Sequence, residues 1–325
     1  MTGLRGLTDV PGFRVGHVTD RAGGTGCTVV LAPDDGAVGA ADVRGPAAGT
    51  IGTESLRPGR LIQRAHAVLL TGGSAFGLAA ATGVTRYLGE REIGYAVGPV
   101  RVPIVVGAVI FDLLVGDPAA RPDAEAGYAA CAAAHDGPVA EGSVGAGTGA
   151  TVGKLLGGER AVKGGLGTAA ASLAGGARVG AIAVVNALGD VVDPASGAIV
   201  AGVRRPDGDG WLDADAAMAA GLEGSVFALS STTLAVVATD AALTKEEAAA
   251  VAMMAHAGVA RATRPAHTML DGDTVFVLAT GAAGRANLTA LGHVAAGVVA
   301  AAIVRGVRTA DGLGGVPSLS ELGAE

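Results

Sequence analysis

Four consecutive hydroxyl side chains stand directly before an apolar run late in this 325-residue chain. They are Ser230, Ser231, Thr232 and Thr233, and the β-branched run that follows, Leu234 to Val237, is typical of a buried strand. A hydroxyl at the first residue of a buried strand is held rigidly, as a nucleophile must be. A polar turn leading into a core strand would leave the same pattern, so both interpretations stay open at this point.

A glycine-rich loop, Gly142 to Lys154, ends in one of only three lysines in the chain. Its pattern departs from the phosphate-binding loop G-x-x-x-x-G-K-[ST], because Thr148 replaces the first glycine and Leu155 follows the lysine. This departure argues against nucleotide binding. What the pattern predicts is a flexible loop that delivers one amine, Lys154.

Other polar residues follow expected strands. Asn186 closes the run Arg178 to Val185; an Asn there is usually a turn residue, but it is also an uncharged hydrogen-bond donor for an oxyanion. Asp271 and Asp273 flank a glycine, a pattern common in hairpin and Asx turns.

Ser74 follows a short strand in the sequence Thr-Gly-Gly-Ser-Ala-Phe-Gly. It does not satisfy the nucleophile-elbow pattern G-x-S-x-G, because Phe76 stands where the last glycine belongs. We therefore expect Ser74 to cap a helix, or to lie in a loop whose free N–H groups face a ligand.

The hydrophobic periodicity predicts a mixture of strands and helices. Expected strands cover 13–18, 27–31, 38–43, 67–70, 102–115, 178–185, 234–237 and 275–279. One expected helix ends near residue 88, and the other expected helices cover 122–134, 164–173, 245–256 and 291–307. The segments 50–58 and 204–223 read as loops. No repeat or linker divides the chain, so we expect one α+β domain over residues 1–325, with sheets covered by helices.

Composition narrows the function classes. Half of the residues are hydrophobic but only 3% are aromatic, and the net charge is −7 with no basic cluster, which argues against nucleic-acid binding. The longest apolar run, residues 291–304, is too short to span a bilayer, and no signal-peptide core precedes it. Cys27 and Cys131 read as reduced core residues of a cytoplasmic protein, and the six histidines show no metal-ligand spacing.

Several sequence blocks along the chain together resemble the P1 peptidase family. This family is also called peptidase S58 or the aminopeptidase/D-esterase family, and it includes the nylon-oligomer hydrolases. The resemblance covers nearly the whole chain. It rests on Val15–Thr19, Leu70–Leu78, Ala108–Leu113, the loop ending at Gly153-Lys154, Thr232–Asp240 and His267–Phe276.

The resemblance implies a layered αββα sandwich of the N-terminal-nucleophile type that cuts itself before its nucleophile, without a cofactor or metal. On the family pattern, cleavage falls between Ser231 and Thr232, giving fragments 1–231 and 232–325. Lys154 and Asn186 correspond to a polar pair beside Thr232. Asp271 and Asp273 fall on positions that contact the nucleophile or the lysine, and the resemblance also implies a homo-oligomer, a tetramer.

Two positions depart from the family pattern. Ser231 stands where relatives commonly have Asn or Gly before the nucleophile, and Phe111 replaces a tyrosine of some relatives. Without that hydroxyl, more of the oxyanion stabilisation would fall to Asn186. We expect Ser74 and Phe111 to bind a small peptide or amide substrate.

Two alternatives remain beside the hydrolase. One is an acyltransferase of the related ornithine-acetyltransferase fold, which would pass its acyl group to an amine. The other is an uncleaved binding protein, which Ser231 makes conceivable.

Overall fold

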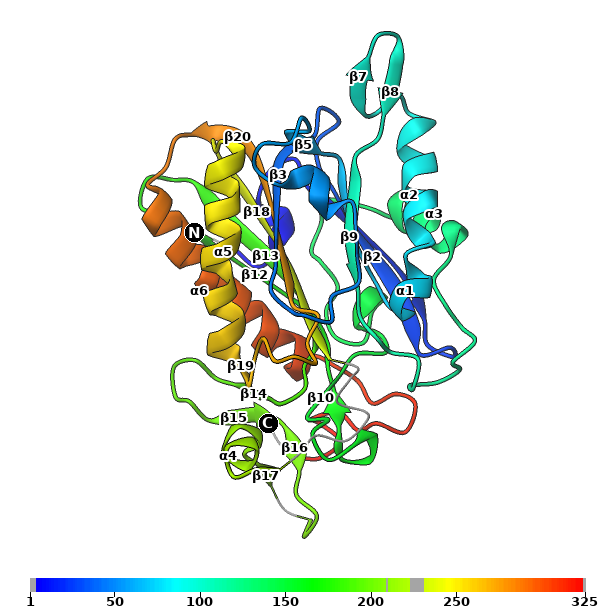
Figure 1. Cartoon of the computed structure of the whole chain (residues 1–325), viewed down its shortest axis with the longest axis vertical. Helices are drawn as coiled ribbons and strands as arrows, with labels where there is room; N and C mark the ends of the chain where they lie inside the picture. The colour runs from blue at the N-terminus through cyan, green and yellow to red at the C-terminus, as the bar shows by residue number, and fades with distance from the viewer. Residues whose placement is uncertain (1–3, 209, 223–230, 324–325) are drawn as a thin grey trace.

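The computed structural model describes residues 4–208, 210–222 and 231–323. Its first sheet has the strand order β1-β2-β6-β9-β4. The strands are β1 (Arg14–Asp20), β2 (Thr25–Leu31), β6 (Ala67–Thr71), β9 (Val105–Val109) and β4 (Thr50–Ile51). Two helices cover one face of this sheet, α2 (Ala80–Gly89) and α3 (Ala124–Ala132), as Figure 1 shows.

The second sheet has the strand order β12-β13-β18-β20-β3-β5. The strands are β12 (Gly165–Ser172), β13 (Arg178–Asn186), β18 (Thr232–Ala241), β20 (Thr274–Gly284), β3 (Ala37–Val43) and β5 (Arg64–Ala65). The pair β18–β20 is parallel, and the others are antiparallel. Helices α5 (Lys245–Ala262) and α6 (Leu288–Arg308) cover its outer face (Figure 1).

The two sheets pack face to face. Alternate residues of β18 divide between two cores: Leu234 and Val236 meet the first sheet, whereas Ala235 and Val237 meet α5 and α6. This alternation is the period of two that a strand imposes on its side chains. Because each sheet carries helices on its other face, the predicted αββα sandwich is confirmed.

One predicted helix is wrong. Residues 164–173, expected to be helical, form strand β12 over Gly165–Ser172. A Cβ on Gly167 would lie 2.1 Å from the carbonyl oxygen of Ala302 in α6, so helix and strand pack closer than any side chain allows. The glycines of this segment serve sheet–helix packing, and the pattern of apolar residues alone does not reveal that.

The outer helices follow their sequence signals. Thr244 caps α5 in the predicted capping box with Glu247. Helix α6 has 21 residues and is long and apolar enough to cross a membrane, in contrast to the shorter apolar run expected. Buried core helices pass the same test, and 67% of its most apolar window is buried in the fold.

Smaller elements complete the described chain. Residues 204–222, expected to be a loop, include the end of β16 (Val203–Arg204), β17 (Trp211–Leu212) and α4 (Ala214–Ala219). The remaining strands are β7 (Tyr95–Val97), β8 (Val100–Val102), β10 (Thr151–Val152), β11 (Val162–Lys163), β14 (Asp190–Val192), β15 (Ile199–Ala201) and β19 (Thr263–Arg264), and α1 covers Ser74–Gly77. Short 3-10 turns cover Leu7–Asp9, Thr53–Leu56, Gly145–Gly147 and Gly158–Arg160.

Candidate active site

Thr232 is the first residue of β18 and is buried. Antiparallel pairing places it directly opposite Asn186, the last residue of β13. The start of one strand and the end of its neighbour therefore bring together two of the predicted residues, which lie far apart in the sequence. Ser230, the first of the four hydroxyl residues, lies outside the described part of the chain.

The peptide carbonyl before Thr232 is held from two sides. The Thr232 Oγ1 hydroxyl donates to the carbonyl oxygen of Ser231 at 2.5 Å. The backbone N–H of Gly272 donates to the same oxygen at 3.0 Å. A negative charge that develops on this oxygen would find the Gly272 N–H already in place, which is how an oxyanion is stabilised.

Sequence reasoning did not identify Gly272 as part of the site. Its lack of a side chain matters, since a Cβ there would lie 2.6 Å from Thr232 Oγ1. Replacing it with alanine should slow the cleavage expected before Thr232 at least about tenfold, because the hydroxyl must move off its carbonyl.

The rate constant of that cleavage, followed by the appearance of the two fragments on denaturing gels, checks this expectation. Gly89→Ala is a suitable control, because a Cβ at Gly89 would meet nothing within 4 Å. A Gly272→Ala protein that cleaves as fast as the wild type would contradict the role given to this close contact.

Lys154 lies against Asn186, as the sequence predicted. Its Nζ donates to the carbonyl oxygen of Asn186 at 2.8 Å and to Oδ1 of the same residue at 2.9 Å. Burial lowers the pKa of Lys154 to about 7, although the nearby Asp271 carboxylate opposes the shift. At neutral pH the amine therefore exchanges between its charged and neutral forms, as a proton acceptor does.

The Asn186 side chain is oriented by its acceptor end. Its Oδ1 accepts from Lys154 and from the backbone N–H of Thr151 at 3.0 Å. Its Nδ2 therefore points the other way and donates to the carbonyl oxygen of Phe111 at 3.3 Å. The donor end of the amide thus lies on the side of Phe111, which lines the cavity beside Thr232.

Asp271 and Asp273 flank Gly272 and are both buried. Asp273 Oδ1 accepts the backbone N–H of Thr233 at 2.6 Å, whereas Asp271 Oδ2 accepts the backbone N–H and the hydroxyl of Thr268 at 2.7 Å each. Burial and the neighbouring Asp273 carboxylate raise the pKa of Asp271 to about 6. Both acids therefore lie along the β20 side of the start of β18, with Asp271 bridged to Ser231 and Asp273 bonded to Thr233.

A second buried lysine supports the glycine loop. Lys163 Nζ donates to the carbonyl oxygens of Thr148 and Ala150, at 2.6 and 2.7 Å. Both carbonyls belong to the loop that carries Lys154, so this ammonium fixes the path of the loop. Burial lowers the pKa of Lys163 to about 7, against the opposing effect of Asp112.

A cavity of ≈ 220 Å³ opens beside Thr232. Ser74 and Phe111, the predicted substrate-binding residues, both line it. The other lining residues are Ala47, Ala48, Gly49, Ala75, Val109, Ser231 and Thr232. No charged side chain is among these lining residues. A second cavity of ≈ 280 Å³ shares Phe111 and includes Lys154 and Glu159.

Ser74 reaches this cavity in a different way from that expected. It is the first residue of α1 with a left-handed φ of 51°, and the helix is capped by Gly73 instead. The N–H groups of Gly73 and Ser74 already donate to Asp112 Oδ1 and to the carbonyl oxygen of Ile110. The prediction that the Ser74 side chain caps a helix is therefore wrong.

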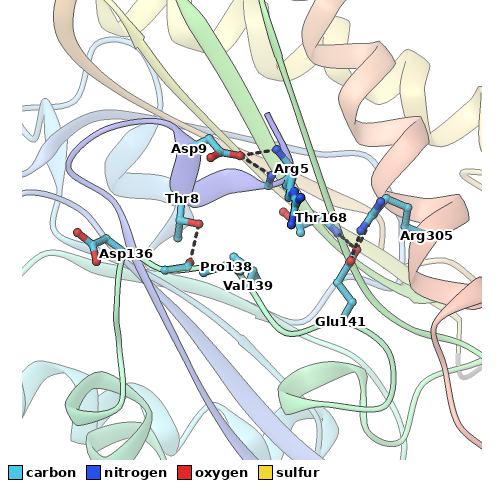
Figure 2. Close-up of a pocket in the computed structure, with 11 residues that line it drawn as sticks. Arg5, Thr8, Asp9, Asp136, Pro138, Val139, Glu141, Thr168 and Arg305 are labelled. Carbon is cyan, nitrogen blue, oxygen red and sulfur yellow. Dashed lines mark hydrogen bonds and ion pairs between the residues drawn. The ribbon is translucent and has the colours of Figure 1, made fainter. Parts of the chain in front are cut away.

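Another cavity, of ≈ 300 Å³, lies elsewhere and contains none of the predicted site residues. Figure 2 shows its polar wall, where Arg305 of α6 pairs with Glu141. Among the described residues no group of three or more His, Cys, Asp or Glu side chains could hold a metal ion. Cys27 and Cys131 are buried free thiols, as predicted.

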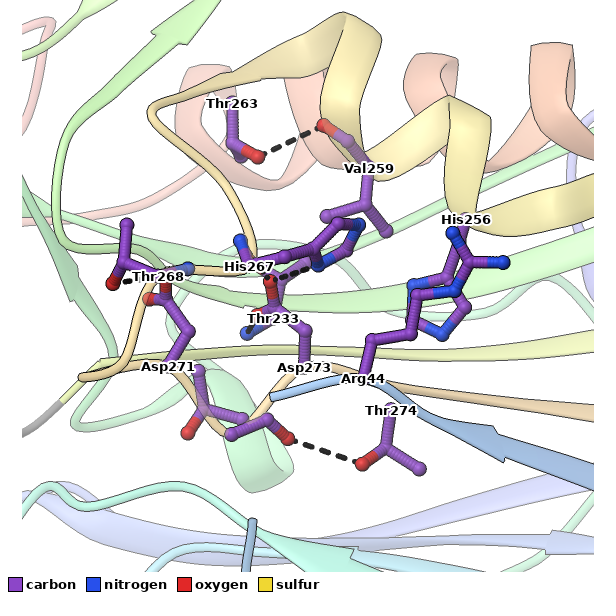
Figure 3. A network of polar contacts seen from close by, with 12 residues as sticks. Arg44, Thr233, His256, Val259, Thr263, His267, Thr268, Asp271, Asp273 and Thr274 are labelled. Carbon is purple, nitrogen blue, oxygen red and sulfur yellow. Dashed lines mark hydrogen bonds and ion pairs between the residues drawn. The ribbon is translucent and has the colours of Figure 1, made fainter. Parts of the chain in front are cut away.

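Sequence reasoning also missed one histidine. His267 Nδ1 lies 2.8 Å from Asp273 Oδ2, and Figure 3 shows the two side chains pointing toward each other. The block from His267 to Phe276 was noted only as part of the family resemblance. No local spacing indicates this contact, because it depends on how the loop folds back.

Solved structures identify the class of protein that this fold defines. A beta-aminopeptidase from Burkholderia sp. superposes with a TM-score of 0.72 at 27% identity, covering 99% of this chain and 93% of that one. An L-aminopeptidase D-Ala-esterase/amidase from Ochrobactrum anthropi, described as a new variant of the Ntn-hydrolase fold, also superposes with a TM-score of 0.72, at 20% identity, covering 98% and 90%. The fold is therefore of the N-terminal-nucleophile hydrolase type.

Sequence comparison defines the family. The model of peptidase family S58 matches residues 5–319, and the chain belongs to this family. An uncharacterised aminopeptidase of Mycobacterium tuberculosis is 44% identical over 348 residues, 98% of each chain. A 6-aminohexanoate-oligomer endohydrolase of a Kocuria species is 33% identical, covering 92% of this chain and 85% of the relative. The chain is thus a hydrolase of the peptidase and amidase kind.

Proposed function

We propose that this protein is a self-processing hydrolase of amide and peptide bonds with Thr232 as its N-terminal nucleophile. The observation that carries the proposal is the position of Thr232 Oγ1 on the Ser231 carbonyl, 2.5 Å from its oxygen, with the Gly272 N–H on that same oxygen. Cleavage there would divide the catalytic domain into fragments 1–231 and 232–325.

Self-cleavage proceeds by an N→O acyl shift. Thr232 Oγ1 forms a bond to the carbonyl carbon of Ser231, its proton passes to neutral Lys154, and the Gly272 N–H stabilises the oxyanion. The bond from that carbon to the Thr232 nitrogen then breaks, and the proton moves to the departing nitrogen. Water hydrolyses the resulting ester, which leaves a carboxylate on Ser231 and a free α-amine on Thr232.

Hydrolysis of substrates uses the amine that cleavage creates. An α-amine has a pKa of about 7.7–8.0, so it can accept the hydroxyl proton of its own residue near neutral pH. Asp271 and Asp273 flank this position and favour the charged amine that results. Thr232 Oγ1 forms an ester with the acyl group of the substrate, the amine leaving group takes the proton, and water releases the acid.

The cavity beside Thr232 supports a small amide or peptide substrate. Its walls carry uncharged side chains, and the donor end of Asn186 bonds the main-chain carbonyl of Phe111, one of the lining residues. An oxyanion formed there could accept from the Asn186 Nδ2 group. The relatives named aminopeptidase and 6-aminohexanoate-oligomer endohydrolase also support an amide substrate.

Intact-mass measurement of the purified protein tests the proposal. We expect fragments 1–231 and 232–325, with the second fragment beginning at Thr232 in N-terminal sequencing. A single uncut chain after long incubation would contradict self-processing and favour the uncleaved binding protein.

A panel of aminoacyl p-nitroanilides and 6-aminohexanoate oligomers then tests hydrolysis. An acyl-enzyme that is stable in water but passes its acyl group to an added amine would instead identify the acyltransferase. Release of free acid without an added amine supports the hydrolase.

A further inference from the structure

The loop between β19 and β20 carries Asp271, Gly272 and Asp273, three residues that contact the start of β18. His267 stands near the beginning of this loop with a left-handed φ of 57°. It is one of three non-glycine residues in the described chain with a positive φ. Glycine would satisfy that backbone geometry with less steric conflict, so a reason for the imidazole must lie in its contacts.

Those contacts converge on one carboxylate oxygen. His267 donates to Asp273 Oδ2 through its backbone N–H at 3.2 Å and through its ring Nδ1 at 2.8 Å. The other oxygen of Asp273 accepts the backbone N–H of Thr233 at 2.6 Å. The imidazole is therefore connected to the residue after the nucleophile through one shared carboxylate.

The same fold-back positions the oxyanion donor. Because His267 and Asp273 close the loop on itself, Gly272 between its acidic neighbours is held with its N–H on the Ser231 carbonyl oxygen. The backbone carbonyls of Asp271 and Asp273 accept from Ala47 and Arg44, which follow β3. These bonds attach the loop to residues 44–47. The bond from His267 to Asp273 joins the beginning of the loop to its end.

We propose that His267 is a positioning residue for the reactions at Thr232. Its Nδ1–H holds the Asp273 carboxylate in the orientation that fixes the Thr233 N–H and the Gly272 N–H. The inference rests on the proposed function, since it assigns a role in the self-cleavage and turnover of Thr232. The imidazole acts through Asp273 and does not touch the reacting atoms.

The contacts of the ring place a proton on Nδ1, because the Asp273 carboxylate oxygen that faces Nδ1 accepts a hydrogen bond. His267 Nε2 is buried and has no hydrogen-bond partner among the described residues, which costs less for a lone pair than for an N–H. The His256 ring lies edge-on to it at 4.9 Å between centroids (Figure 3). His256 Nε2 lies 2.9 Å from the carbonyl oxygen of Asp42, and burial lowers the His256 pKa.

Three substitutions separate the hydrogen bond from the backbone. His267→Asn keeps an N–H donor on the short side chain and tolerates a left-handed φ, whereas His267→Gly keeps only the backbone freedom. His267→Ala keeps neither. We expect Ala and Gly to slow self-cleavage at least about tenfold, and Asn to stay within about threefold of the wild type.

The measurements are the first-order rate of fragment formation and, on the cleaved fraction, kcat and KM for a p-nitroanilide substrate. The rate losses should appear in kcat, with KM little changed. His293→Asn, at an exposed position of α6, is the control. Circular dichroism spectra and melting temperatures establish that each variant is folded.

Each outcome decides the proposal. The proposal is supported if His267→Asn keeps a rate of self-cleavage near that of the wild type while His267→Gly is slow. If His267→Gly and His267→Asn are equally fast, only backbone strain matters and the proposal is overturned. Equal loss in Asn and Ala, or no loss in Ala, also overturns it. If the wild type itself stays uncut, the proposed self-processing fails; if the wild type cuts and all variants match it, only the role of His267 fails.

Discussion

Replacing Thr232 by alanine should leave one uncut 325-residue chain with no measurable amide hydrolysis. The substitution removes the oxygen that we propose attacks the Ser231 carbonyl, and without cleavage no α-amine forms at this position. Loss of both nucleophile and base should reduce kcat/KM by at least about 10⁴-fold, the scale seen when a covalent nucleophile is removed. Intact mass and the p-nitroanilide assay measure the two effects.

Thr232→Ser is the matched control, since it keeps the hydroxyl and loses only a methyl group. It should still cleave into fragments 1–231 and 232–325. Cleavage of the Thr232→Ala chain at a neighbouring bond would place the nucleophile at Ser231 or Thr233 instead, and the fragment masses would distinguish these positions.

Replacing Lys154 by methionine should lower the rates of self-cleavage and of hydrolysis by at least about 10²-fold, as for the loss of a positioned proton acceptor. Methionine fills similar space but leaves the two Asn186 oxygens without this donor. Lys154→Arg separates two roles, because arginine keeps a positive charge but does not lose its proton in proteins. If Lys154 acts as a base, arginine should be nearly as slow as methionine.

The pH dependence gives a second test of the same amine. Burial lowers the Lys154 pKa to about 7, so the neutral form that accepts a proton increases as the pH rises through this value. The self-cleavage rate of freshly translated precursor should therefore rise from pH 6 to pH 8. A flat profile, or an arginine variant with wild-type rates, would contradict a role as base.

Local patterns predicted the elements that carry the site. The apolar runs of β13 and β18 and the capping box of α5 each lie within a few residues, so the sequence reveals them directly. Strand β12 was missed because its alanines favour a helix, whereas its glycines serve contact with α6, which lies far along the chain. The packing of this segment against α6, a tertiary contact, decides that it is a strand.

The candidate site shows the same limit. The family resemblance selected Lys154, Asn186 and the two aspartates, and the structure brings them together around Thr232. The Gly272 N–H and His267 were not identified, because their roles depend on a loop that meets β18 across long sequence separations. Thr233 and Asp273, for example, are 40 residues apart in the chain.

The three lysines have one further consequence. Each is buried and donates to main-chain carbonyls: Lys154 to Asn186, Lys163 to the glycine loop, and Lys245 to Ser55, Arg60 and Ile62. No lysine amine of the folded chain is therefore presented to solvent. Amine-reactive dyes and cross-linkers should modify the native protein only at α-amines, so a label gained during incubation of the precursor would report the chain end that the proposed cleavage creates.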